Sequence, residues 1–335
     1  MRILFATDAI DRVSTQLNAP NFAKLSEMEG VNIDFYNRNY VDYDVVLFMG
    51  YDPRVVEARA AKPSLKIGVI DLRPSSVEKS LGADFVIANG VEMQDWLSNY
   101  FENIFIYPIY PQINVPLKKH AQNQPLIVGY HGNKVHLTAM TPYLSAALES
   151  LADLRAIELW AIYDVKNLGE PAFEICDPSK VRIRYIQWSP DAYETHLALA
   201  DIGVVPTVIP IQNEKSAKEK IASHSSLYQP HESDYLVRFK NTSNAGRIYV
   251  FSQLGIPVVA GITPSASQAI KHGVNGYLAC SAGGWFSALK KLADSAEHRA
   301  QLGHRLYEAF QDEVSVNNLN LHLVEFIQNL SIGTV

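Results

Sequence analysis

The segment 238–260, RFKNTSNAGRIYVFSQLGIPVVA, places two cations beside the start of a predicted helix. Arg238 and Lys240 precede a small polar turn, and a helix pattern then runs to Leu254. The first turn of a helix presents backbone N–H groups and a partial positive charge, so with two cations it suits a phosphate group. A capped surface helix with two solvated cations would show the same local pattern. The turn itself adds hydroxyl and amide donors from Thr242, Ser243 and Asn244.

Four other loops in the second half of the chain follow predicted strands and carry residues that suit a nucleotide. Aromatic side chains can stack on a base, and cations, amides and glycine turns can hold phosphates. Each type also has a common structural use: a loop lysine is most often exposed, a histidine often occupies a turn, and a tryptophan often fills a core. The candidates are His131, Gly132, Asn133, Lys134, Tyr163, Gln187, Trp188, Pro206 and Thr207.

Three charged residues in the first half also follow predicted strands, and we take them as candidate catalytic residues. Asp71, in VIDLRPSS, could remove a proton from an acceptor hydroxyl. It could equally cap the following turn through its carboxylate. Arg73 could hold an anionic sugar or acceptor, and Asp8 has the same two interpretations as Asp71.

Two sets of short apolar runs alternate with helix patterns, separated by a proline-rich segment. Continuous apolar strands between helices predict parallel sheets covered on both faces, so we expect two doubly wound α/β domains. Residues 108–125 hold four prolines and predict an interdomain linker. The expected strands are 3–6, 31–36, 45–50, 66–72, 84–88 and 104–107, then 126–130, 157–163, 181–186, 202–205, 257–260 and 275–279. Among the expected helices are 21–28, 53–61, 92–101, 137–154, 191–200, 265–272 and 317–330.

Composition restricts the class of protein. The chain has 335 residues, enough for two domains, and its 47% hydrophobic and 19% charged residues are typical of a globular protein. The formal net charge of -6 argues against a general nucleic-acid binder. Cys176 and Cys280 form no metal-like pattern, and neither a signal peptide nor a membrane-length apolar run is evident. We expect a soluble cytoplasmic protein, a class compatible with peripheral contact at the inner face of a membrane.

The second half resembles GT-B-fold glycosyltransferases, specifically group 1, family-4-like enzymes. The segment 187–206, QWSPDAYETHLALADIGVVP, is similar to a region where a strand, a short helix and a second strand follow one another. GIPVVA at 255–260, NGYL at 275–278 and the terminal helices look like that superfamily's closing pattern. GYHGNK, at 129–134, lies where its C-terminal domain begins. The resemblance covers roughly 125–310, whereas the first half matches only in its rhythm of strands and helices.

This resemblance implies the GT-B architecture, two Rossmann-like domains facing an interdomain cleft. Residues 113–315 would bind a nucleotide-sugar donor, and residues 1–112, completed by the last helix at 316–335, would bind the acceptor. Lys134, Arg238 and Lys240 would hold the phosphates, Gln187 and Trp188 would lie near the base, and Tyr163 near the nucleoside or sugar. Cations and helix N–H groups would stabilise the leaving phosphate without a metal or another cofactor. The expected partners are a nucleotide sugar and a glycan or lipid-linked glycan.

The chain departs from the family pattern at one point. Retaining members usually carry two glutamates eight positions apart, and the corresponding positions here are Thr242 and Val250. The donor and the stereochemical outcome therefore stay open, and a nucleoside-monophosphate sugar is one alternative. The segment 207–236 is long enough to form a lid. We expect a glycosyltransferase of surface polysaccharide or glycoconjugate assembly; the alternatives are a nucleotide-sugar 2-epimerase of the same fold and a non-catalytic two-lobed binding protein.

Overall fold

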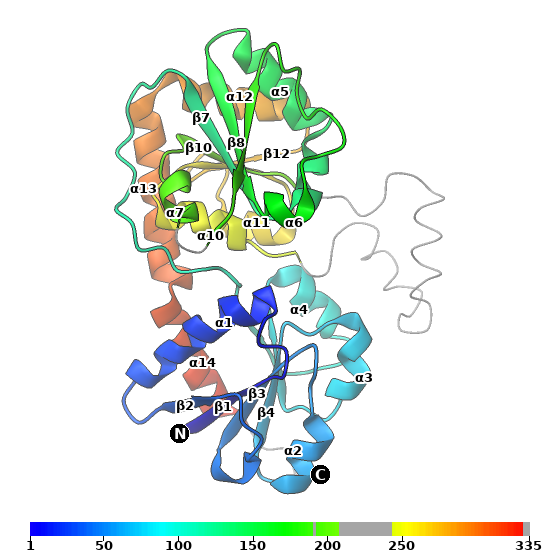
Figure 1. Ribbon diagram of the computed structural model, residues 1–335. Coiled ribbons are helices and arrows are strands. Elements are labelled where there is room, and N and C mark those ends of the chain that lie inside the picture. Colours follow the sequence, from blue (N-terminus) through cyan, green and yellow to red (C-terminus); the bar gives the residue numbers. More distant parts are fainter. Residues whose placement is uncertain (190–191, 208–242, 331–335) are drawn as a thin grey trace. The chain divides into compact units, whose positions relative to one another are not determined.

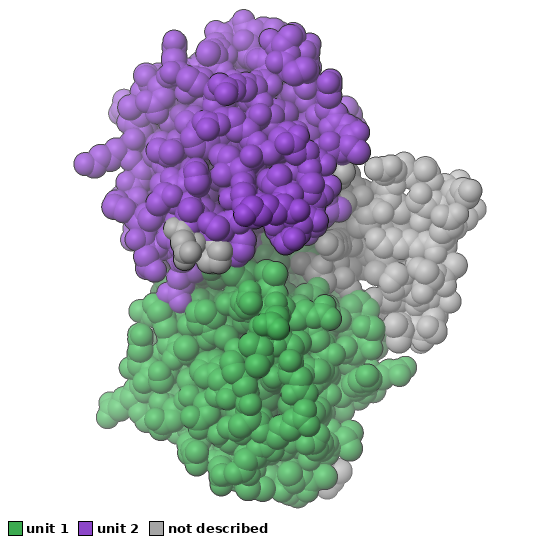
Figure 2. Space-filling model, in the orientation of Figure 1, with its two compact units in different colours: residues 1–111, 211–244, 313–335 green, residues 112–210, 245–312 purple. Residues whose placement is uncertain are grey.

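A computed structural model of the protein describes residues 1–189, 192–207 and 243–330. These residues belong to two compact units, coloured separately in Figure 2. The first unit contains residues 1–111, 243–244 and 313–330, and the second contains the described residues of 112–207 together with 245–312. In the described ranges, no helix combines the length and the apolar character needed to cross a membrane.

The first unit is built on a sheet of six parallel strands. Their order in the sheet is β2-β1-β3-β4-β5-β6, and every neighbouring pair is parallel. The central strands are buried on both faces because their sequences, such as VVLFM in β3, are apolar throughout. The strands are β1 (Arg2–Ala6), β2 (Asn32–Phe35), β3 (Val45–Met49), β4 (Lys66–Ile70), β5 (Phe85–Ala88) and β6 (Ile104–Ile106).

Helices cover both faces of this sheet (Figure 1). On one face lie α1 (Val13–Ala23) and the C-terminal helix α14 (Val316–Asn329). Phe5 of β1 packs 5.8 Å from Phe22 of α1, and Phe326 of α14 lies 5.7 Å from Phe85, measured between ring centroids. The other face buries the core that includes residues of α2 (Val55–Ala61), α3 (Val77–Ser80) and α4 (Val91–Leu97). The C-terminal helix therefore completes the unit that the first strand begins.

The first helix differs from the prediction. The sequence predicts a helix at 21–28, but α1 begins at Val13, contains Pro20, and is followed by the 3-10 turn η1 (Lys24–Glu27). The buried side of α1 is largely polar, so it shows little apolar periodicity. Asn21 Nδ2, for example, donates to the carbonyl of Tyr110 at 3.0 Å. Hydrogen bonds to buried amides replace the hydrophobic contacts that would have marked this helix in the sequence.

The second unit repeats the plan with the sheet order β12-β11-β10-β7-β8-β9. One face is covered by α5 (Tyr143–Ala152) and α12 (Ala282–Asp294), whose apolar residues share one core with the strands. Against the other face, α10 (Gly246–Gln253) packs closely because Gly203 leaves room for the Phe251 ring. The strands are β7 (Leu126–His131), β8 (Ile157–Tyr163), β9 (Arg182–Gln187), β10 (Ile202–Val205), β11 (Val258–Gly261) and β12 (Tyr277–Ala279). Also present are α6 (Val165–Leu168), α7 (Tyr193–Leu197), α11 (Pro264–Ala269) and α13 (Ala296–Val314).

The long helix predicted at 137–154 is in fact two elements. A 3-10 segment, η4 (Lys134–Met140), comes first, and α5 starts only after Pro142 at its N-cap. A proline has no N–H to donate and restricts the residue before it, so it suits a helix start and interrupts a continuous helix. With this correction and that of α1, the predicted fold class, two doubly wound parallel α/β units, is confirmed.

The proline-rich segment 108–125 contains no helix or strand, but residues near its start and in its second half form hydrogen bonds with other parts of the protein. Tyr110 is buried, and its hydroxyl donates to the carbonyl of Val314 in the first unit. Further along, the Lys118 N–H donates to the carbonyl of Leu254 at 2.8 Å, and His120 Nε2 donates to Gly255 O at 2.9 Å in the second unit. Residues 108–111 of the segment therefore belong to the first unit, and residues 112–125 belong to the second.

Candidate functional site

In the second sheet, β7 and β10 are neighbours although β8 and β9 lie between them in the sequence. The strand order reverses at this pair, and in open parallel sheets a ligand is expected outside the carboxyl ends of two such strands. Four predicted site residues lie at these ends. They are His131 and Gly132 at the end of β7, and Pro206 and Thr207 after β10.

A residue that the sequence analysis missed connects the ends of these two strands. Arg247 is the second residue of α10, and its Nη2 donates to the carbonyl of Pro206 at 3.0 Å. The carbonyl of Arg247 accepts a hydrogen bond from His131 Nε2 at 3.1 Å. A Cβ added to Gly132 would lie 3.0 Å from Cδ of Arg247, so glycine leaves space for the arginine side chain. These contacts bring β7, β10 and α10 together; we call His131, Gly132, Pro206 and Arg247 the α10 corner.

The charge of the α10 corner comes from Arg247. Burial lowers its pKa, the neighbouring Tyr130 hydroxyl opposes that effect, and a guanidinium stays protonated in proteins. Its Nη1 is buried and has no hydrogen-bond partner among the described residues. A buried N–H of a cation without an acceptor is unfavourable, and an anionic oxygen at this position would satisfy it. Burial also lowers the pKa of His131 to about 4, so the ring is neutral at pH 7 and its proton is on Nε2, facing the Arg247 carbonyl.

Lys134 and Tyr163 lie beside the α10 corner and hold a neighbouring loop. Lys134 Nζ donates to the carbonyl of Leu168 and, at 3.3 Å, to that of Glu170. The buried Tyr163 hydroxyl donates to the carbonyl of Gly169 at 2.9 Å. Both side chains thus support the loop after α6, and their contacts with a nucleotide stay predictions. Asn133 accepts from the N–H of Val135 and so caps η4.

The predicted base-stacking residue is accessible. Trp188 directly follows β9, and its backbone N–H donates to the carbonyl of Tyr163 at 2.8 Å. Its side chain is 39% exposed and lies 5.8 Å from the ring of Tyr193. Gln187 accepts from the Lys166 N–H at 2.8 Å, so its amide is used to fix the same loop. An exposed aromatic face on a fixed backbone suits stacking of a base.

Of the remaining donor-site predictions, the structure describes Thr207, Ser243 and Asn244. Thr207 lies against Gly261, because a Cβ added there would be 2.8 Å from the Thr207 hydroxyl. Ser243 and Asn244 are half-buried and directly precede Ala245, the N-cap of α10. Val250, at the position of the second expected glutamate, is buried in α10 as a core residue. Arg238, Lys240 and Thr242 lie outside the described residues.

In the first unit, the structure brings Asp71 and Arg73 together. Asp71 follows β4 with a φ of 53°, a left-handed conformation that Asp tolerates better than most residues. Its carboxylate is fully buried, accepts from Asn89 and pairs with Arg73. The backbone of Asp71 lies so close to Gly50 that position 50 has to be glycine, since an added Cβ would be 2.6 Å from the Asp71 carbonyl oxygen. Burial raises the pKa of Asp71, although the positive charge of Arg73 opposes that effect.

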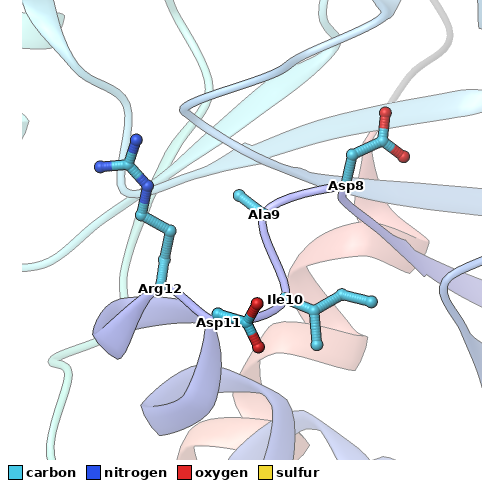
Figure 3. Close-up of a pocket in the computed structure, with 5 residues that line it drawn as sticks. All are labelled: Asp8, Ala9, Ile10, Asp11 and Arg12. Atoms are coloured by element: carbon cyan, nitrogen blue, oxygen red, sulfur yellow. The ribbon is translucent and has the colours of Figure 1, made fainter.

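Asp8 is exposed and paired with two arginines. Its Oδ2 lies 2.5 Å from Arg38 and 2.8 Å from Arg54. The hydrogen bond from Arg54 lowers its pKa, so the carboxylate is ionised and only weakly basic. Asp8 also begins the loop 8–12, which surrounds a hollow of about 270 Å³ (Figure 3).

A metal site was not expected. In the portion of the chain that the structure describes, no group of His, Cys, Asp or Glu residues is arranged to hold a metal ion. The expected metal-free chemistry stays a prediction.

Comparisons with known proteins rest on structure alone. No family model and no curated protein matches the sequence. A glycosyltransferase from Rickettsia africae ESF-5 matches with a TM-score of 0.60 and 11% identity, covering 99% of both chains. Sucrose-phosphate synthase from Thermosynechococcus elongatus matches with 0.59 and 11%, covering 98% of this chain and 99% of that one. HepE from Anabaena in complex with UDP-glucose matches with 0.55 and 12%, covering 98% and 100%. These whole-chain matches confirm the expected fold of two Rossmann-like units: the chain has the GT-B fold.

Proposed function

We propose that this protein is a glycosyltransferase that takes a sugar from a nucleotide-activated donor and transfers it to a hydroxyl acceptor. The donor binds at the α10 corner of the second unit, and the acceptor binds at the carboxyl edge of the first sheet. The observation that carries the proposal is the buried Nη1 of Arg247, which has no hydrogen-bond partner among the described residues and belongs to a side chain bonded to Pro206 at the carboxyl end of β10. The similar structure that contains UDP-glucose shows that this fold accommodates such a donor.

The chemistry follows from the leaving group. When the bond between the sugar and the nucleotide breaks, negative charge develops on a phosphate oxygen, and a fixed cation nearby lowers the barrier. Arg247 supplies that cation, and the positive end of the α10 dipole acts in the same direction. Neutral His131 fixes the first turn of α10 without adding a second charge. Trp188 stacks on the base, and Lys134, Arg238 and Lys240 remain further phosphate candidates.

We also propose the class of acceptor, a reaction without a metal, and the place in the cell where the enzyme acts. The acceptor is a glycan or lipid-linked glycan in surface polysaccharide or glycoconjugate assembly, and the enzyme works without a metal. It acts in the cytoplasm, where peripheral contact would bring it to the inner face of the membrane. Asp8, Asp71 and Arg73 act on the acceptor side. Without an acid at Val250, the ribose of the donor is held by other groups.

Calorimetry with UDP, GDP, ADP and CMP tests the donor site in the full-length protein. We expect one nucleotide to bind, with affinity reduced about tenfold or more by Arg247→Gln, in line with loss of a charged hydrogen bond. Absence of binding to all four would refute the proposal.

Product analysis with the matching nucleotide sugar then defines the reaction. Release of the nucleotide that depends on an added acceptor supports transfer. Isomerisation of the sugar without any acceptor would indicate a 2-epimerase instead. Binding with no turnover, across a panel of acceptors, would indicate a binding protein.

A further inference from the structure

The strand order of the first sheet also reverses, as it does at β7 and β10 in the second. In the order β2-β1-β3-β4-β5-β6, the strand order reverses between β1 and β3, so a ligand is expected outside their carboxyl ends. Asp52, after β3, joins the two loops there. Its Oδ1 accepts from the Thr7 hydroxyl at 2.9 Å and its Oδ2 from the Asp8 N–H at 2.6 Å. The hollow of loop 8–12 lies beside these contacts, with Asp8 and Arg12 at the two ends of the loop (Figure 3).

Two guanidinium groups from different loops each lie against the ring of Tyr51. Arg12, at the N-cap of α1, places Cζ 5.0 Å from the ring centroid of Tyr51, which follows β3. Arg73, after β4, places Cζ 5.3 Å from the same centroid, and its Nη2 donates to the Tyr51 hydroxyl at 3.2 Å. The Tyr51 hydroxyl also shares a hydrogen bond with Ser14 in α1. The aromatic ring attracts each of the two cations, and it holds both guanidinium carbons within 5.3 Å of its centroid.

Arg73 is held in place by the buried carboxylate of Asp71. Asp71, whose side chain is fully buried, pairs with Arg73 through Oδ2 and accepts from Asn89 through Oδ1. Both carboxylate oxygens are thus used inside the protein, which suits a residue that positions Arg73. Nε of Arg73 is buried and has no hydrogen-bond partner among the described residues. An orphaned N–H on a half-buried cation is the kind of group that a bound anion satisfies.

The nearby carboxylates do not neutralise both cations. Asp8 pairs with Arg38 and Arg54, and Asp52 is engaged by Thr7 and Asp8. Asp71 is buried beneath Arg73. Asp11 adjoins Arg12 in the chain and lines the same hollow. In the described part of the chain, the Arg12 guanidinium makes only the contact with Tyr51, so it remains available to an external anion.

We infer that Arg12 and Arg73, assembled on Tyr51, bind an anionic group of the acceptor, a phosphate or a carboxylate carried by a hydroxylated molecule. Guanidinium groups match both anions in geometry, and two of them from different loops select an anion over a neutral sugar. The role as acceptor site rests on the proposed function, whereas the binding of the anion does not.

Binding of small probes to the full-length protein tests this site. Glucose 6-phosphate, glucuronate and glucose are titrated separately by calorimetry, without any nucleotide. We expect at least one anion to bind about tenfold or more tightly than glucose, which corresponds to about 1.4 kcal/mol. The stronger of the two anions identifies the group as phosphate or carboxylate. Equal binding of all three probes, or none, would overturn the inference.

Arginine variants locate the binding. Arg12→Gln and Arg73→Gln should each reduce the affinity for the preferred anion about tenfold, as expected for one charged hydrogen bond. Arg2→Gln is the matched control, because Arg2 lies 5.1 Å from the ring of Tyr43 at the opposite end of β1 and should leave binding unchanged. Arg73→Gln leaves the buried Asp71 carboxylate without its ion-pair partner, which can destabilise the protein. Arg12 is exposed, so the Arg12→Gln variant is expected to fold.

An equal loss in Arg2→Gln, or no loss in Arg12→Gln, would place the anion elsewhere. Failure of nucleotides to bind in the donor experiment would leave these titrations unaffected, because the probes contain no nucleotide and Arg12 is in the first unit.

Discussion

Nε2 of His131 lies 3.1 Å from the carbonyl oxygen of Arg247, and this hydrogen bond attaches the first turn of α10 to the end of β7. The His131 ring also packs against Phe251, one helical turn further along, with 5.1 Å between ring centroids. One side chain thereby fixes both the position and the rotation of α10. The Arg247 side chain then projects toward Pro206 with little freedom, as a preorganised phosphate ligand requires.

Replacement of Arg247 tests its charge separately from its packing. Arg247→Gln keeps a donor for the Pro206 carbonyl but removes the cation, so nucleotide affinity should fall about tenfold to a hundredfold. Arg182→Gln removes an arginine at the far end of β9 that pairs with Glu158 at 3.4 Å, and should leave affinity unchanged. Calorimetry measures both, and circular dichroism confirms that each variant is folded. Equal losses in the two variants would show a general effect of net charge.

The half-buried His131 predicts a dependence of stability on pH. His131 has a pKa of about 4 in the folded protein, while an unfolded histidine titrates near about 6.5. Above pH 6.5 both states are neutral; as pH falls toward 4, only the unfolded state gains a proton and the folded protein loses stability. The loss from this residue should reach about 2 kcal/mol at pH 5. Urea unfolding at pH 7.5 and 5.0 measures it, and the decrease should be smaller in His131→Gln. An identical decrease in both proteins would contradict the assignment.

Close packing of α10 on the sheet requires glycine at position 203. A Cβ added to Gly203 would lie 2.6 Å from Cγ of Phe251, so Gly203→Ala should destabilise the protein by about 1–3 kcal/mol. Gly283→Ala is the matched control. No atom lies within 4 Å of its added Cβ, and alanine there, in the first turn of α12, should be neutral or slightly stabilising. Thermal unfolding of both variants provides the comparison, and similar melting temperatures would show that α10 shifts to accept the extra methyl group.

The central strands could be predicted from sequence because each is a short apolar run between polar turns, whereas the edge strands β2 and β9 alternate polar and apolar residues. VVLFM in β3 and IGVV in β10 are buried on both faces, so every position in them carries the signal. The start of α1 could not be predicted from sequence. The polar residues Thr15, Asn18 and Asn21 form most of its buried side, so apolar residues do not recur with the period of a helix. The break before α5 was present in the sequence as Pro142 but was outweighed by the apolar pattern around it.

The candidate site was predictable only where residues directly follow strands. The loops that contain His131, Trp188 and Asp71 were recognised for that reason. Arg247 lies inside a helix, and its importance comes from hydrogen bonds to residues 41 and 116 positions away. The pairing of Arg12 with Tyr51 is equally non-local. Contacts of this kind follow from the order of strands in the sheet, which local patterns do not specify.

Trp188 should report nucleotide binding by fluorescence. Its side chain is 39% exposed, whereas Trp96, Trp160 and Trp285 are buried, so a stacked base should quench Trp188 selectively. Trp188→Ala should weaken binding about tenfold, the lower range for loss of one stacked base, and should remove the quenching. Trp188→Phe keeps an aromatic face and should retain most of the affinity. Unchanged affinity in the alanine variant would exclude stacking at this position.

Asp71 should act by positioning Arg73, and the kinetics of one variant distinguish this role from that of a general base. Asp71→Asn removes the charge that holds Arg73 but keeps the size of the side chain. As a positioning residue, it should raise KM for an anionic acceptor about tenfold, while the pH profile of kcat keeps its shape. Loss of a general base would instead lower kcat by about a hundredfold or more and abolish the acidic limb of that profile. Asp42→Asn, at an exposed position before β3 and so at the opposite end of that strand from Tyr51, is the control and should change neither quantity by a comparable amount.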